Sequence, residues 1–223
     1  MSQRQRQGRL AGLLADLGRR EAAVRPPAPR LDTMTPSDAE RVLELYRALG
    51  GEAESFAVFR PGVWDIVLSD GLIVELDEEQ HFNRYRHATL DVAWADGLPW
   101  ADDYRRYSVE HEDAALKKAK RGGYWASPST EAMFGAADAP GVFEPSGSPR
   151  WKQRALYDAM RDVLAATGAV RLSRVAVWDV VGDTTLARIL DGRADVDHDA
   201  LAELISIRGH GLADSALPAI FPS

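Results

Sequence analysis

The stretch GVWDIVLSDGLIVELDEEQHF, residues 62–82, decides the fold. Two apolar runs, IVL and LIV, flank the sequence SDG, which favours a tight hairpin turn. The strands on either side of the turn are therefore expected to pair antiparallel. With the turn centred near Asp70, residues whose numbers sum to about 140 lie opposite each other, so Asp65 faces Glu75.

The carboxylates of this hairpin raise an electrostatic question. Side chains alternate between the two faces of a strand, so Glu75 and Asp77 share one face. Like charges directly opposite each other on a sheet repel, and a cation between Asp65 and Glu75 would remove that cost. Carboxylate oxygens suit Mg²⁺ first, or Mn²⁺. The alternative is a solvated acidic face of an antiparallel sheet.

The remaining sequence supplies helices on both sides of this hairpin. From the pattern we expect an α+β (α/β/α-like) protein with a mixed central sheet flanked by helices. An N-terminal helical segment is expected at 1–50, and an α/β core at 51–223 with a long loop insertion at about 121–150. The expected helices are 8–24, 36–49, 84–120 with a break at 97–100, 150–167, 182–190 and 197–207, and the expected strands are 55–60, 63–69, 71–77 and 170–181.

Composition narrows the class of protein. The chain has 223 residues, no cysteine and a net charge of −7, so neither a disulfide framework nor a zinc-thiolate site is expected. No apolar run approaches the roughly 18 residues of a membrane span, and Asp16 and Glu21 interrupt the N-terminal apolar residues, which predicts a cytoplasmic protein with no membrane partner. A pI of about 5.3 argues against a general nucleic-acid coat protein.

The hairpin also carries a family resemblance. An Asp on one strand, a turn, and a strand ending in Glu-x-Asp before Glu-Gln-His resembles the PD-(D/E)XK nuclease superfamily, in particular the branch of very short patch repair endonucleases. The motif stands here as VELDEEQH, residues 74–81. A later helix with a Lys and a strand ending near an Arg are matched loosely by Lys152 and Arg174. The resemblance covers 55–82 well and 150–178 loosely.

The resemblance implies a restriction-endonuclease-like fold and a Mg²⁺- or Mn²⁺-dependent endonuclease that hydrolyses nucleic acid, with DNA as the expected partner. It implies that the metal ligands are Asp65, Glu75 and Asp77, and that the catalytic residues are Asp65, Glu75, Asp77, Gln80, His81 and Lys152. The family's signature Lys, two residues after the Glu, is Asp77 here. This departure supports an alternative: an impaired nuclease fold that serves as a nucleic-acid-binding or interaction module in a defence or repair system.

Two basic clusters flank the long loop, in LKKAKRGGYW and GSPRWKQR. Basic residues interleaved with aromatic ones suit contacts with phosphates and stacked bases. The alternative is ordinary helix-end charge placement and a solvated helix start. The predicted nucleic-acid-binding residues are Lys117, Lys118, Lys120, Arg121, Arg150, Lys152 and Arg154.

Overall fold

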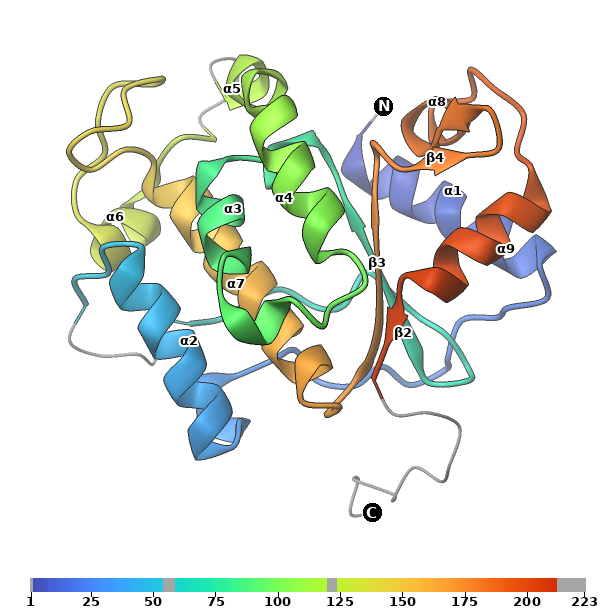
Figure 1. Ribbon diagram of the computed structural model, residues 1–223, viewed down its shortest axis with the longest axis horizontal. Coiled ribbons are helices and arrows are strands. Elements are labelled where there is room, and N and C mark those ends of the chain that lie inside the picture. The colour runs from blue at the N-terminus through green and yellow to red at the C-terminus, as the bar shows by residue number, and fades with distance from the viewer. Residues whose placement is uncertain (1, 54–58, 120–123, 212–223) are drawn as a thin grey trace.

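The computed structural model describes residues 2–53, 59–119 and 124–211, which fold as an α+β protein (Figure 1). The strands are β1 (Ile66–Val67), β2 (Leu72–Asp77), β3 (Arg171–Ala176), β4 (Val180–Val181), β5 (Thr184–Thr185) and β6 (Gly209–His210). The α-helices are α1 (Gln3–Asp16), α2 (Pro36–Ala48), α3 (Arg84–Leu90), α4 (Ala101–Glu110), α5 (Glu112–Ala119), α6 (Pro128–Phe134), α7 (Pro149–Ala166), α8 (Leu186–Leu190) and α9 (His198–Ile207).

The hairpin forms with the predicted register. Strand β1 pairs antiparallel with β2, with Ile66 opposite Val74 and Val67 opposite Ile73. Each pair sums to 140, as the position of the SDG turn predicts. The next position of this register places Asp65, just before β1, beside Glu75. The predicted strand 63–69 is shorter than expected, because regular pairing is confined to two residues of β1.

The mixed sheet has the strand order β1-β2-β3-β6. Strand β3 pairs parallel to β2, with Glu75 opposite Arg174, and the chain reaches it through helix α7. Parallel neighbours need such a crossover. Strand β6 adds antiparallel to β3 at Ser173 and Leu172, a pairing that the sequence pattern did not predict because β6 has only two residues, one of them glycine.

Helices cover both faces of the sheet (Figure 1). Even-numbered residues of β2, such as Val74 and Leu76, pack with apolar side chains of α1, α8 and α9. The odd-numbered Ile73 packs with side chains of α3 and α4, and Glu75 and Asp77 share its face. The alternation therefore turns both carboxylates toward the side of the sheet on which α7 lies.

The N-terminal helices pack into the body of the protein. Leu10 and Leu14 of α1 are fully buried in the same cluster as Val74, and Val42 of α2 packs in a cluster with Leu156 of α7. Fully burying one such side chain contributes about 1.5–3 kcal/mol. Residues 1–50 thus complete two of the apolar clusters rather than standing apart.

Further segments differ from the sequence-based expectation, among them the predicted helix 8–24, which the structure has at Gln3–Asp16. The predicted loop 121–150 contains α6, whose start is fixed by the side chain of Ser127, which accepts a hydrogen bond from the Thr130 amide at 3.4 Å, and by Pro128 in the first turn. Of the predicted strand 55–60, residues 54–58 lie outside the described part of the chain, and Phe59 and Arg60 are not in a strand.

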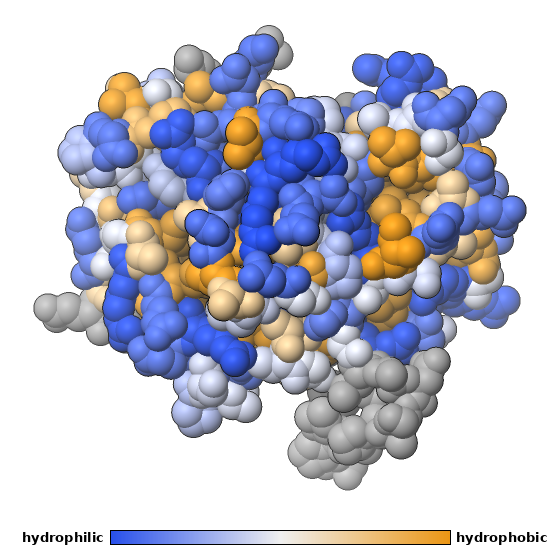
Figure 2. Space-filling view, viewed as in Figure 1, coloured by the Kyte–Doolittle hydropathy of each residue, from blue (hydrophilic) through white to orange (hydrophobic). Residues whose placement is uncertain are grey.

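The surface in Figure 2 is hydrophilic over α4, where Arg105 pairs with Asp102 and Arg106 pairs with Asp103. Within the described residues, no helix combines the length and the apolar character needed to cross a membrane.

Candidate metal centre

The hairpin brings Asp65 and Glu75 into direct contact through the backbone. The amide of Asp65 donates to Glu75 Oε1 at 3.0 Å, and the amide of Leu76 donates to Asp65 Oδ2 at 3.0 Å. Burial raises the pKa of Asp65 to about 6 and that of Glu75 to about 7. The two carboxyl groups are therefore close together, as the register predicts. Their buried surroundings disfavour ionisation of both groups without a cation nearby.

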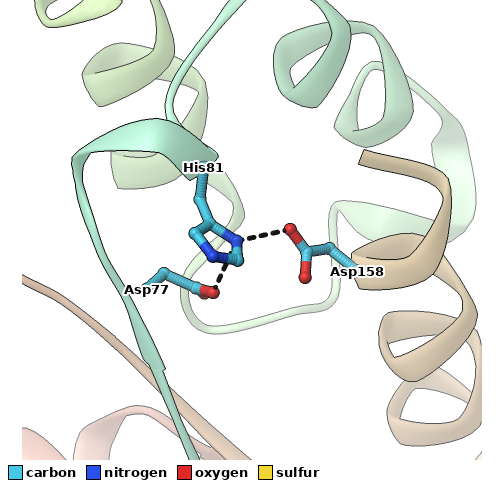
Figure 3. Close-up of side chains that lie close together, drawn as sticks. All are labelled: Asp77, His81 and Asp158. Atoms are coloured by element: carbon cyan, nitrogen blue, oxygen red, sulfur yellow. Dashed lines mark hydrogen bonds and ion pairs between the residues drawn. The ribbon is translucent and has the colours of Figure 1, made fainter. Parts of the chain in front are cut away.

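A second group lies at the carboxyl end of β2 (Figure 3). His81, on the 3₁₀ turn Glu79–His81, has its Nδ1 at 2.7 Å from Asp158 Oδ2 of α7 and 3.1 Å from Asp77 Oδ1. One potential ligand atom from each of the three side chains lies within 4.8 Å of the others. In the described part of the chain this is the group that could hold a metal ion, and Asp65 and Glu75 are not members of it.

Buried arginines hold the carboxylates in place. Arg174 of β3, fully buried, contacts Asp77 and reaches Asp158 Oδ1 at 3.4 Å and Asp162 Oδ1 at 2.8 Å. Burial disfavours an ionised Asp158, but the charges of His81 and Arg174 outweigh it and hold the Asp158 pKa well below its usual value.

Two further arginines complete the network. Arg161 of α7 pairs with Glu75 Oε2 at 3.2 Å, and Arg86 of α3 pairs with Asp162 at 2.5 Å. The sheet and the helices thus each contribute carboxylates and guanidinium groups to one buried layer.

The charges of this layer do not balance. Its carboxylates are Asp65, Glu75, Asp77, Asp158 and Asp162, and its guanidinium groups are Arg86, Arg161 and Arg174. Five carboxyl groups face three guanidinium groups among the described residues, and the excess of negative charge is reduced by His81, whose charge helps to hold down the Asp158 pKa, and by the raised pKa values of Asp65 and Glu75. A divalent cation would neutralise that excess. The donor set of carboxylates and imidazole fits Mn²⁺ and, through its oxygens, Mg²⁺.

The rim of the site is balanced. Glu79 pairs with Arg6 at 3.0 Å and with Lys118 at 2.6 Å, and Glu78 pairs with Arg6 at 3.3 Å. The Arg154 guanidinium donates to the Gln80 carbonyl and side chain at 3.2 and 3.1 Å. Gln80 is thus held by Arg154, and the side chain of His81, which is 15% exposed, gives solvent a route to the group.

The other predicted residues lie apart from the carboxylates. Lys152 is buried at the start of α7, with its ammonium 5.6 Å from the Tyr85 ring and 5.9 Å from the Phe134 ring. Burial lowers its pKa. The cations in contact with Glu75 and Asp77 are Arg161 and Arg174 instead. Of the predicted nucleic-acid-binding residues, Lys117 is exposed on α5, Arg150 bonds Gln153, and Lys120 and Arg121 lie outside the described residues.

Sequence reasoning missed Asp158, Arg161 and Asp162. Asp158 and Asp162 are four residues apart and so share one face of α7, but acidic residues at this spacing are usual on a solvated helix face. The apolar residues around them give a signal that could have found them. Leu156, Ala159, Met160 and Val163 leave α7 little surface that faces solvent, so its acidic residues are expected to be buried as well.

Comparison with known proteins places the chain in a family without assigning it an activity. The chain belongs to the family of unknown function DUF7255, whose match spans residues 44–192. That span contains every residue of the buried layer, from Asp65 to Arg174, whereas Arg6 of the rim lies outside it. No curated protein and no solved structure matches the chain.

Metal binding at this group can be measured without an activity assay. We expect Mn²⁺ to raise the melting temperature of the wild type, because an ion at one hundred times its Kd stabilises a folded protein by about 2.7 kcal/mol. His81→Ala should remove most of that gain, whereas His87→Ala, at a half-buried position of α3, should keep it. Differential scanning calorimetry with and without Mn²⁺ distinguishes the variants, and an equal response of both would contradict the assignment.

Proposed function

We propose that the protein is a divalent-metal-dependent nuclease with a restriction-endonuclease-like core, and that it hydrolyses phosphodiester bonds in DNA. The observation that carries this proposal is the convergence of Asp77, His81 and Asp158 beside the Asp65–Glu75 pair, in a layer where carboxyl groups outnumber guanidinium groups. Glu75, Asp77 and His81 belong to the motif of residues 74–81 that resembles the PD-(D/E)XK superfamily. Asp65 and Asp158 contact residues of this motif.

In this proposal Asp77, His81 and Asp158 hold Mn²⁺ or Mg²⁺. A bound divalent ion lowers the pKa of water and offsets charge that develops on a phosphate. Arg174 fixes the two aspartates through its contacts with both, and Arg161 fixes Glu75 at 3.2 Å. Glu75 then orients the Asp65 backbone, while the exposed edge of His81 faces incoming substrate. The expected location is the cytoplasm.

A specific observation favours a second candidate. The cations beside Glu75 and Asp77 are buried arginines that already pair with them, and the family's Lys position is Asp77. A guanidinium group stays protonated at all accessible pH values and so does not serve as a general base that activates water. The second candidate is therefore a nuclease-fold module, in a defence or repair system, that binds nucleic acid without cutting it.

The two candidates differ in a cleavage assay. The purified chain is incubated with supercoiled plasmid and with single-stranded DNA, in Mg²⁺, in Mn²⁺ and in EDTA. For the nuclease we expect metal-dependent nicking that falls at least about 100-fold in His81→Ala and in Asp77→Asn, since a positioned acid–base or ligand group contributes roughly 10²–10⁴-fold.

The controls are Glu44→Gln, an exposed carboxylate on α2, and His87→Ala, and both should cut like the wild type. Cleavage that persists unchanged in His81→Ala and Asp77→Asn belongs to a contaminant and contradicts the proposal. Binding without cleavage in any metal selects the second candidate.

A further inference from the structure

A cavity of about 720 Å³ opens along α7, on a different face from the carboxylates. It is bounded by α6, by the first half of α7 and by the segment before β1. Its size falls in the range of roughly 300–1,000 Å³ that is typical of small-molecule sites.

The lining is cationic in an acidic protein. Arg60 and Arg150 line the cavity, and among the described residues that line it there is no carboxylate. Arg150 Nη1 donates to the side chain of Gln153 at 2.5 Å, which holds the guanidinium at the cavity wall. Two arginines with no acidic partner in the lining suit an anionic group with several oxygen atoms, such as a phosphate.

The rest of the lining suits a planar, partly apolar group. Tyr157 contributes an aromatic ring, and Met133 and Ala132 of α6 contribute apolar surface. The Tyr157 hydroxyl is fixed by the Arg60 amide, which donates to it at 3.2 Å. Two arginines beside an aromatic ring offer contacts to both the phosphate and the base of a nucleotide.

The cavity adjoins the carboxylate layer. Tyr157 lines the cavity and Asp158, the next residue of α7, belongs to the candidate metal group. Arg161 donates to the carbonyl of Gly62, which lines the cavity, at 2.8 Å and pairs with Glu75 at 3.2 Å. A ligand in the cavity would therefore contact the face of α7 next to the one that carries Asp158 of the proposed site of hydrolysis.

We propose that this cavity binds one nucleotide of a single-stranded nucleic acid, with its phosphate against Arg60 and Arg150 and its base against Tyr157 and Met133. The bound nucleotide would be part of the substrate of the proposed nuclease, and this role in a reaction rests on the proposed function. Binding itself needs no metal, so it can be tested separately.

The test measures the anisotropy of fluorescein-labelled hexathymidylate titrated with the full chain in EDTA at several salt concentrations. We expect Arg60→Gln/Arg150→Gln to weaken binding about tenfold and to reduce the salt slope by about 0.7, the contribution of one phosphate contact on a single strand. The matched control is Arg30→Gln/Arg47→Gln, which removes the same charge from exposed surface positions and should bind within about twofold of the wild type.

Competition separates the parts of the ligand. Thymidine 5′-monophosphate should displace the probe at lower concentration than thymidine or inorganic phosphate. No binding by the wild type, equal weakening in both double variants, or equal competition by phosphate and the nucleotide each overturns the proposal.

The outcomes also separate the two proposals. Binding that depends on Arg60 and Arg150, without cleavage in any metal, refutes the nuclease and retains the nucleotide site. Cleavage that is indifferent to both arginines retains the nuclease and refutes the nucleotide site.

Discussion

Replacing Arg174 by methionine should lower the free energy of unfolding by about 3–5 kcal/mol, the cost typical of breaking a buried ion pair by removing one partner. Arg174 is fully buried and contacts Asp77, Asp158 and Asp162. Without it, these carboxylates remain in a low-dielectric layer with fewer cations to offset them. Urea denaturation at pH 7.5 in EDTA, followed by circular dichroism, measures the loss.

The control is Arg171→Met on the same strand, at a partly exposed position where Arg171 donates to the Asp70 carbonyl at 3.0 Å. Surface substitutions of this kind usually change stability by less than about 0.5 kcal/mol. Adding Asp77→Asn to Arg174→Met should recover part of the loss, since coupled neighbours interact by roughly 0.5–3 kcal/mol. Equal losses in the two single variants, or no coupling with Asp77, would show that Arg174 does not hold this layer together.

Much of the hairpin could be predicted because its determinants are local. The SDG turn sets the register, and a period of two sets the face of each side chain, so the contact between Asp65 and Glu75 follows from sequence alone. The start of helix α6 could be predicted from Ser127 as N-cap and Pro128 in the first turn. The low apolar content of the surrounding segment favoured a loop instead. Strand β6 carried no signal, because two residues give no period to detect.

The partners of the hairpin could not be predicted, because they come from distant elements. Which face of α7 meets the sheet is decided by packing, and that choice brings Asp158 and Arg161 rather than Lys152 to the carboxylates. The cations in contact with Glu75 and Asp77 are therefore Arg161 and Arg174. A sequence motif fixes spacing along a chain, whereas the charge balance of a buried layer depends on every element that packs against it.

The free energy of unfolding of the metal-free protein should fall as the pH rises from 5 to 8. The pKa of Glu75 is about 7 in the folded protein, against an ordinary value of 4.5. A carboxyl group whose pKa is raised by folding stabilises the folded state fully below its unfolded pKa, and this stabilisation is lost as the pH passes the folded pKa. Asp65, with a pKa of about 6, acts in the same direction. The expected loss is about 2–3 kcal/mol across this window.

Glu75→Gln tests the cause of this pH dependence, because its amide stays neutral throughout while an oxygen remains to accept the Asp65 amide. Its stability should change less between pH 5 and 8 than that of the wild type, whereas Glu44→Gln should follow the wild type.

Mn²⁺ should stabilise the wild type more at pH 8 than at pH 5, because protons and a divalent ion compete for the same carboxylate layer. Urea denaturation in EDTA and in Mn²⁺ at each pH measures both effects. If the stability of the wild type and of Glu75→Gln changed equally with pH, the group that titrates would not be Glu75. If the stabilisation by Mn²⁺ did not depend on pH, the ion would not bind to these carboxylates.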